Sequence, residues 1–422
     1  MTESSTSTTG RLSDKPLGVY YAGYTASMTA DQVWLTTLGW SAAQLGEPLL
    51  TGAVLGAGTL PRAALMLLGG VLVDRVGIRL LALGTQAARV LGMLAAAVLA
   101  MSFPDEWVPL FIVALVFGAI SALNIPALAA APALLAAPAR LPRITAILQT
   151  AQRVATVIGA PVGGLLLATG GPVSATIACA LLFALALAGF QRTRLPNRPA
   201  TAAEERHRAT DGFRYILSEP ILRALLVTIA CLNITIIGSF NVGLPLLVTD
   251  QGWPASAYGL IEGCFGLGAV LGAVAVVVTR TPLRPARAAL LYAATQIPLL
   301  ASLAYLERPA AVAITAAGAG LTLGPAGALL VGLVQALTDR SYIGRVVSIV
   351  NFVSVGLTPI FYLAFSAVAG STGIRTAFLA TGAFQAAIVV CGLCNRTLRT
   401  ATLPPTADHA RIKKSQESIG NT

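Results

Sequence analysis

The stretch Gly70-Val-Leu-Val-Asp74-Arg75-Val-Gly77-Ile-Arg79 lies between two apolar runs, at approximately residues 49–73 and 80–101. Each run is long enough to cross the hydrocarbon core of a bilayer as an α-helix, which takes about 20 residues. Gly77 permits a tight turn between the runs, because glycine tolerates backbone angles that other residues avoid. The stretch therefore predicts two neighbouring membrane helices joined by a short charged turn.

Comparable apolar runs occur along the rest of the chain and form two sets of six. The first set is completed by runs at approximately 17–39, 107–129, 144–168 and 172–190, and the second set comprises 222–248, 257–278, 287–306, 310–336, 346–369 and 374–395. The sequence thus predicts an all-α polytopic membrane protein, with twelve transmembrane helices in two six-helix bundles. The expected domains are an N-terminal tail (1–16), a first bundle (17–190), a charged linker (191–221), a second bundle (222–395) and a C-terminal tail (396–422).

The composition argues against a soluble domain and against a nucleic-acid-binding domain. Of the 422 residues, 56% are hydrophobic and 11% are charged, whereas soluble domains carry about 25% charged residues. The net charge of +11 does not indicate nucleic-acid binding, because it is concentrated in alternate loops. With the N-terminus inside, the inner segments hold 23 Lys and Arg residues and the outer loops hold 2. The positive-inside rule then predicts that both termini lie in the cytoplasm. We expect the protein in the inner (cytoplasmic) membrane.

Cysteine and histidine usage gives no sign of metal or redox chemistry. All five cysteines fall in apolar runs, including the Cys391-x-x-Cys394 pair, while His207 and His409 lie in polar segments. We therefore expect no metal and no cofactor. The sequence also lacks Gly-x-Ser-x-Gly, His-Glu-x-x-His and a phosphate-binding loop ending in Gly-Lys-Ser/Thr, so it does not predict an enzyme.

The charged turn resembles the signature of the major facilitator superfamily of secondary transporters. Gly70, Asp74, Arg75, Gly77 and Arg79 match its Gly-x3-Asp-Arg-x-Gly pattern with closing basic residues, whereas Ile78 replaces the first of these basic residues. The resemblance implies a cytoplasmic gate at this turn and two six-helix halves that rock around a central site. Two further stretches, Gly212-Phe-Arg-Tyr-Ile-Leu-Ser-Glu-Pro220 and Gly344-Arg345-Val-Val-Ser-Ile, are similar to the branch that contains bacterial macrolide and siderophore exporters.

The fifth apolar run contains Gly159-Ala-Pro161-Val-Gly163-Gly164-Leu165. It partly resembles the Gly-Pro-x-x-Gly-Gly element of antiporters in this superfamily, with Pro161 and Gly164 matching and with Ala160 and Leu165 in place of glycines. Ordinary close packing of helices through small residues explains the same pattern equally well. The fourth run has no arginine, unlike that of many drug–proton antiporters.

Five charged residues fall within the predicted helices: Asp31, Arg62, Arg89, Arg153 and Glu262. Charges in a membrane are costly and mark functional sites by default. Asp31 is the first candidate for proton coupling and Glu262 the second. An ion pair of Asp31 with Arg62 or Arg89 is the alternative, and Arg89 is expected at the periphery. The candidates for lining a substrate cavity are Tyr24, Arg62, Gln149, Arg153 and Asn241.

These observations together predict a secondary active transporter, a proton-coupled exporter of a small organic molecule such as a drug, natural product or siderophore. An uptake symporter of the same fold is the nearest alternative, and a non-transporting membrane protein is a more distant one. The expected partners are the small-molecule substrate, protons and the lipid bilayer, without nucleic acid, and we expect a monomer.

Overall fold

The computed structural model describes residues 15–104, 106–135, 140–193, 209–279, 282–339 and 342–401. Within these ranges the chain forms helices and turns and no strand. The helices of the N-terminal part are α1 (Lys15–Ala43), α2 (Pro48–Val76), α3 (Ile78–Ser102), α4 (Trp107–Leu135) and α5 (Leu141–Arg192). They are followed by α6 (Ala209–Ser218), α7 (Pro220–Gly238), the π-helical turn η2 (Ser239–Gly243), α8 (Leu244–Asp250), α9 (Ala255–Val278), α10 (Pro285–Leu303), α11 (Pro309–Leu337), α12 (Ile343–Gly356), α13 (Thr358–Thr372), α14 (Ile374–Cys394) and α15 (Arg396–Thr400).

The described helices have the length and composition of membrane helices. Nine segments in the described ranges are long and apolar enough to span a bilayer. One of them, within α5, bends at Gly171 (φ 65°), so that its two arms correspond to the predicted runs 144–168 and 172–190. With α1 and α2, of 29 residues each, the helices are consistent with twelve crossings. The chain is an all-α, multi-pass membrane protein.

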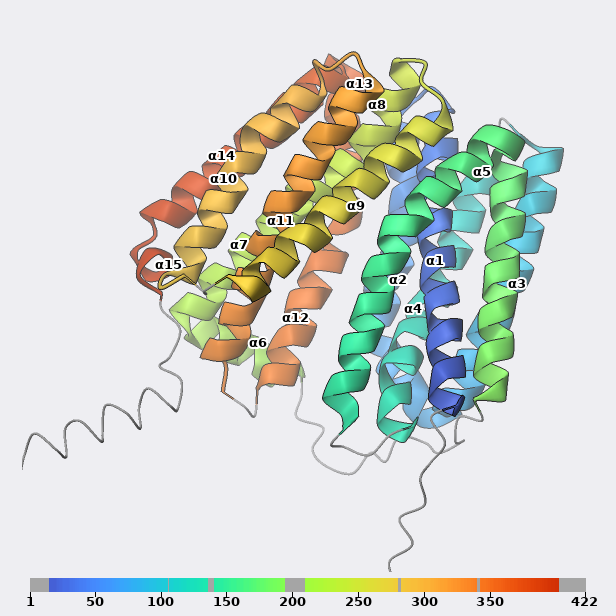
Figure 1. Cartoon of the computed structure of the whole chain (residues 1–422), viewed down its shortest axis with the longest axis horizontal. Coiled ribbons are helices and arrows are strands. Elements are labelled where there is room, and N and C mark those ends of the chain that lie inside the picture. Colours follow the sequence, from blue (N-terminus) through green and yellow to red (C-terminus); the bar gives the residue numbers. More distant parts are fainter. Residues whose placement is uncertain are drawn as a thin grey trace, which may run out of the picture.

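The helices form two groups that lie side by side (Figure 1). In the first group, α1 and α3 pack on α5, and α2 packs on α4. In the second group, α11 packs on α9 and α10, and α14 packs on α10. The two groups meet mainly where α5 contacts α9 and α2 contacts α13. We call the groups the first half (α1–α5) and the second half (α7–α14).

The two ends of this assembly differ in how the halves meet. At one end, the loop end, α1 turns into α2 at residues 44–47 and α8 turns into α9 at residues 251–254. There the main apolar core contains residues of both halves, such as Trp34, Leu55, Phe240 and Tyr258. At the opposite end, the linker end, each half has its own apolar core among the described residues. Among the described residues, the shared apolar core thus lies at the loop end, and Figure 1 shows the two groups diverging toward the linker end.

The predicted linker, 191–221, is not entirely irregular. Residues 194–208 lie outside the described part of the chain, but α6 follows them and packs against α12. Tyr215 of α6 stacks on Tyr342 at a ring-centroid distance of 4.3 Å, and Ile216 is buried in the core of the second half. The polar composition of this segment did not indicate a helix, because the apolar residues of the short amphipathic α6 are few and are concentrated on one face.

Candidate functional site

A cavity of about 790 Å³ lies between the halves, below the closed loop end. Its polar and charged lining residues are Tyr24, Asp31, Gln32, Thr59, Arg62, Arg89, Ser121, Asn124, Thr145, Gln149, Gln152, Thr156, Asn351 and Tyr362. Most of the lining belongs to the first half, and Asn351 and Tyr362 come from the second. Because Leu141 and Thr145 at the start of α5 also line it, the cavity extends toward the linker end.

Arg89 and Asp31 form an ion pair on the wall of this cavity. Arg89 Nη1 lies 3.1 Å from Asp31 Oδ2, and the exposed fractions of the two side chains are 2% and 30%. The guanidinium also donates to Ser27 Oγ at 3.3 Å and to Ser121 Oγ at 2.9 Å. Its carbon lies 5.0 Å from the ring centroid of Phe183 and 5.3 Å from that of Phe117. The pair therefore joins α1, α3 and α4 within the first half. Both side chains line the cavity, and the Asp31 carboxylate is the more exposed of the two.

Arg62 of α2 places a second guanidinium in the same cavity. Its Nε is buried and makes no hydrogen bond, and its charge lies close enough to Arg89 and Tyr362 for electrostatic interaction. The Tyr362 hydroxyl accepts a hydrogen bond of 2.6 Å from Asn241 Nδ2. Since Asp31 is engaged by Arg89, the charges that line the cavity sum to one net positive charge.

Glu262 of α9 connects the second half to α1. Its carboxylate accepts a hydrogen bond of 2.9 Å from Thr36 Oγ1 and a long one of 3.5 Å from Gln32 Nε2. The side chain is 7% exposed, and no described Lys or Arg lies within ion-pair distance of it. Gln32 also lines the cavity, so it links the buried carboxylate to the polar space below.

Small residues bring the halves into contact around Glu262. A Cβ atom added to Gly164 of α5 would lie 2.7 Å from the Ala255 carbonyl oxygen and 2.8 Å from Gly259 Cα. Pro161 packs against Gly263 in the same way. The antiporter-like segment of the fifth run thus lies in the crossing of α5 with α9, at the closed end of the molecule.

The structure brings some of the predicted cavity residues together and separates others. Four of the predicted site residues line the cavity: Tyr24, Asp31, Arg62 and Gln149. Asn241 does not line it but donates a hydrogen bond to Tyr362, which does. Arg153 is exposed and is not a lining residue. Arg89 is not peripheral as expected, because α3 packs on α4 and α5 and the Arg89 side chain reaches Ser27 and Asp31 of α1. Tyr362, Thr36 and Gln32 were not among the residues predicted for the site. The i, i+4 spacing of Gln32 and Thr36 on one helix face was the available signal.

The charged turn after α2 is described only in part. The α2 helix continues through Asp74 to Val76 and ends at Gly77, which has a φ of 88°. Arg79 is exposed at the start of α3. The surroundings of Gly70 and the side chains of Asp74 and Arg75 lie outside the described part of the structure, so the predicted gate remains a prediction.

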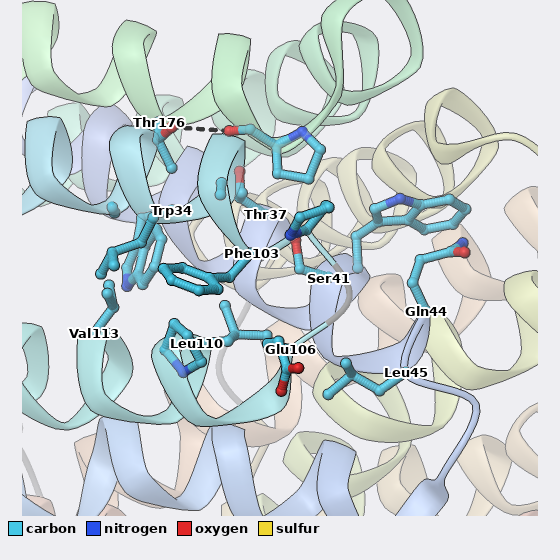
Figure 2. A pocket seen from close by; sticks show the side chains of 17 residues that line it. Trp34, Thr37, Ser41, Gln44, Leu45, Phe103, Glu106, Leu110, Val113 and Thr176 are labelled. Atoms are coloured by element: carbon cyan, nitrogen blue, oxygen red, sulfur yellow. Dashed lines mark hydrogen bonds between the residues drawn. The ribbon is translucent and has the colours of Figure 1, made fainter.

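A second pocket, of about 420 Å³, lies near the loop end of the first half. Figure 2 shows Trp34, Phe103, Leu110 and Val113 around it, with Glu106 and Gln44 toward its rim. Trp34 lines both this pocket and the central cavity. Because all its lining residues belong to the first half and its neighbouring loop, this pocket is not shared between the halves.

A helical membrane bundle with a polar cavity between two halves is the architecture of many membrane transporters. The chain matches the sequence model of the Major Facilitator Superfamily over residues 17–363, and it belongs to this superfamily. It is accordingly a transport protein and not an enzyme.

Proteins with known activities show the same relationship. The multidrug efflux pump Tap of Mycolicibacterium fortuitum is 24% identical over 352 residues, which cover 79% of this chain and 84% of Tap. The enterobactin exporter EntS of Shigella flexneri is 29% identical over 214 residues, about half of each chain (50% and 49%).

Solved structures share the fold at low sequence identity. The nucleoside transporter NupG has a TM-score of 0.71 at 13% identity and covers 89% of this chain and 97% of its own. A bacterial homologue of the iron transporter ferroportin, in an inward-facing state, has a TM-score of 0.68 at 14% identity, covering 89% of this chain and 98% of its own.

Proposed function

We propose that this protein is a monomeric, proton-coupled exporter that moves a small organic molecule out of the cytoplasm by alternating access. The single observation that carries the proposal is a polar cavity between two halves that are closed at one end and separate at the other. Rocking of the halves would expose such a cavity to each side in turn.

The direction of transport is inferred from relatives and from charge. Tap and EntS are both named as exporting proteins. The distribution of Lys and Arg favours a cytoplasmic linker end in the inner membrane. With this orientation, the cavity opens toward the cytoplasm, where an exporter collects its substrate.

We infer further that the substrate carries an acidic group. Arg62 faces the cavity, and its buried Nε lacks a hydrogen-bond acceptor. A carboxylate or comparable anion would satisfy this donor through charge-assisted hydrogen bonds, which are stronger than neutral ones. Asn351 and Tyr362 lie in the same cavity on the opposite half, so a substrate bound to Arg62 would touch both halves.

Asp31 and Glu262 are the residues proposed to couple this movement to protons. Asp31 lines the cavity beside the substrate site, where a bound proton would weaken its pairing with Arg89. Glu262 is buried between the halves with neutral donors only, and burying a carboxylate in this way costs several kcal/mol. Protonation of Glu262 removes that cost and so favours closure of the loop end. A proton taken up from outside would then drive the return of the empty protein to its inward-open state.

Inverted membrane vesicles test the proposal directly. A panel of fluorescent organic anions is added outside, with the vesicle interior acidified, and accumulation is compared between wild-type protein, Arg62→Gln and vesicles without the protein. We expect accumulation by the wild type that collapses when the pH gradient is dissipated, and loss of most of it in Arg62→Gln. Accumulation in right-side-out vesicles instead would identify an uptake symporter, and accumulation that ignores the gradient would refute proton coupling.

A further inference from the structure

Four arginines converge at the linker end of the second half, and none of them lines the central cavity. Arg284 and Arg287 of the α10 start, together with Arg396 and Arg399 of α15, line a concave surface of about 590 Å³. Its other lining residues are Leu291, Leu393 and Thr400. None of the lining residues is acidic, and no ion pair joins these four arginines to a described acidic side chain. We call this surface the four-arginine pocket.

The α15 helix holds two of these arginines in fixed positions. The Asn395 side chain accepts hydrogen bonds from the backbone N–H groups of Thr397 and Leu398 and so caps the helix. Leu398 is 2% exposed and packs into the core of the second half. Arg396 and Arg399, three residues apart, share a helix face. The arginines are therefore presented by a docked helix.

The α10 helix holds the other two in a similar way. Pro285 and Ala286 are buried in the first turn, while Arg284 and Arg287 on either side of them are exposed. Four like charges around one concave surface repel one another, and this repulsion is relieved when an anion binds between them. The positive-inside rule accounts for the presence of arginines on this side of the membrane, but it does not require them to share one pocket.

We propose that the four-arginine pocket binds the headgroup of an anionic phospholipid. Guanidinium groups bind phosphate oxygens through paired hydrogen bonds, and basic pockets between membrane helices on the cytoplasmic side bind acidic headgroups. Leu291, half exposed, and Leu393 lie at the ends of the membrane helices α10 and α14, where the acyl chains of a lipid begin. This apolar margin favours a phospholipid over free phosphate.

Native mass spectrometry of the full-length protein in detergent tests this inference with phosphatidylglycerol as the probe and phosphatidylcholine as the neutral comparison. The variants are R284Q/R287Q and R396Q/R399Q, and the matched control is R214Q/R223Q, which removes two exposed arginines of the same side outside the pocket. We expect each pocket variant to bind phosphatidylglycerol on the order of tenfold more weakly, with phosphatidylcholine binding unchanged and with the control close to wild type.

Three outcomes would overturn the proposal. An equal loss in the R214Q/R223Q control would indicate general electrostatic attraction, and an equal loss of phosphatidylcholine would show that headgroup charge is not recognised. Displacement of phosphatidylglycerol by millimolar inorganic phosphate, without retention of the lipid, would identify a free-anion site instead. The two pocket variants alter different helices, so a folding defect in one, seen by size-exclusion chromatography, leaves the other as the test.

Discussion

Arg89 is the residue whose environment differs most from its sequence-based expectation. Burying a guanidinium to 2% exposure is costly unless hydrogen bonds and an opposite charge compensate for the lost water. Asp31, Ser27 and Ser121 satisfy the terminal nitrogens, and two phenylalanine rings cover the planar faces. Arg89 Nε remains without a partner. The position of Asp31 is therefore tied to the stability of the first half as well as to the cavity.

The Asp31→Asn and Arg89→Gln variants should show strongly non-additive effects on stability. Each single change leaves one member of a buried ion pair without its counter-charge, which costs more than the net value of the pair. We expect the double variant to be more stable than the sum of the singles predicts, by about 1 to 3 kcal/mol. Thermal unfolding of the four purified proteins in detergent measures this coupling. Strict additivity would mean that the pair does not contribute as a unit.

Glu262→Gln should favour the closed loop end. The amide has no charge to bury, while it still accepts the Thr36 hydroxyl proton, so it imitates the protonated carboxyl group. Tyr258 on the same helix and Tyr362 of α13 lie close enough to interact electrostatically with the Glu262 charge. We expect substrate binding from the linker side to persist while accumulation driven by a pH gradient is lost. Wild-type accumulation by this variant would remove Glu262 from the coupling mechanism.

The helices show which features a sequence can predict and which depend on packing. Apolar runs predicted the break within α5, because Gly170 and Gly171 interrupt the pattern, and Gly171 adopts a positive φ that favours glycine. Nothing in the sequence predicted η2, since a π-helical turn shifts backbone hydrogen bonds without changing the hydrophobic pattern. The interruption at Leu357 between α12 and α13 is different, because Pro359 at the start of α13 lacks a backbone N–H and disfavours a continuous helix.

The same distinction applies to the candidate site. Tyr24, Asp31 and Arg62 could be predicted because a polar or charged side chain within a membrane run is conspicuous by itself. The neighbours of Arg89 could not, because the rotation of α3 within the bundle depends on all its contacts with α4 and α5. Arg153 follows Gln152 directly in α5, yet Gln152 lines the cavity and Arg153 does not.

Gly164→Ala should destabilise the contact between α5 and α9. The new methyl group would meet the Ala255 carbonyl and Gly259 only while the loop end is closed, and overpacking of this kind costs about 1 to 3 kcal/mol. We expect the population to shift toward states in which these helices separate. Gly92→Ala is the matched control, because an added Cβ there has no neighbour within 4 Å. Equal reactivity of loop-end cysteines in both variants would show that the crossing does not control closure.

Across the whole molecule, the arrangement of apolar cores determines which movements cost little free energy. Each half keeps a core of its own at the linker end, so the halves can rotate there without exposing much apolar surface. The loop-end core is shared by both halves. Opening that end requires α2 to separate from α13 and α5 to separate from α9. New contacts at the linker end would have to offset this loss for the two states to have similar free energies.

Cysteines at the two ends should therefore report opposite accessibility in a variant whose five native cysteines are replaced by alanine. Gln152→Cys lies on the cavity and is exposed, whereas Ser366→Cys lies under Gly52 at the α2–α13 contact and is fully buried. In detergent we expect a water-soluble maleimide to modify position 152 rapidly and position 366 slowly. Adding Gly164→Ala should slow the first reaction and accelerate the second, because opening one end requires closure of the other. If both rates rise together, the substitution loosens the bundle locally, and the halves do not alternate between two closed ends.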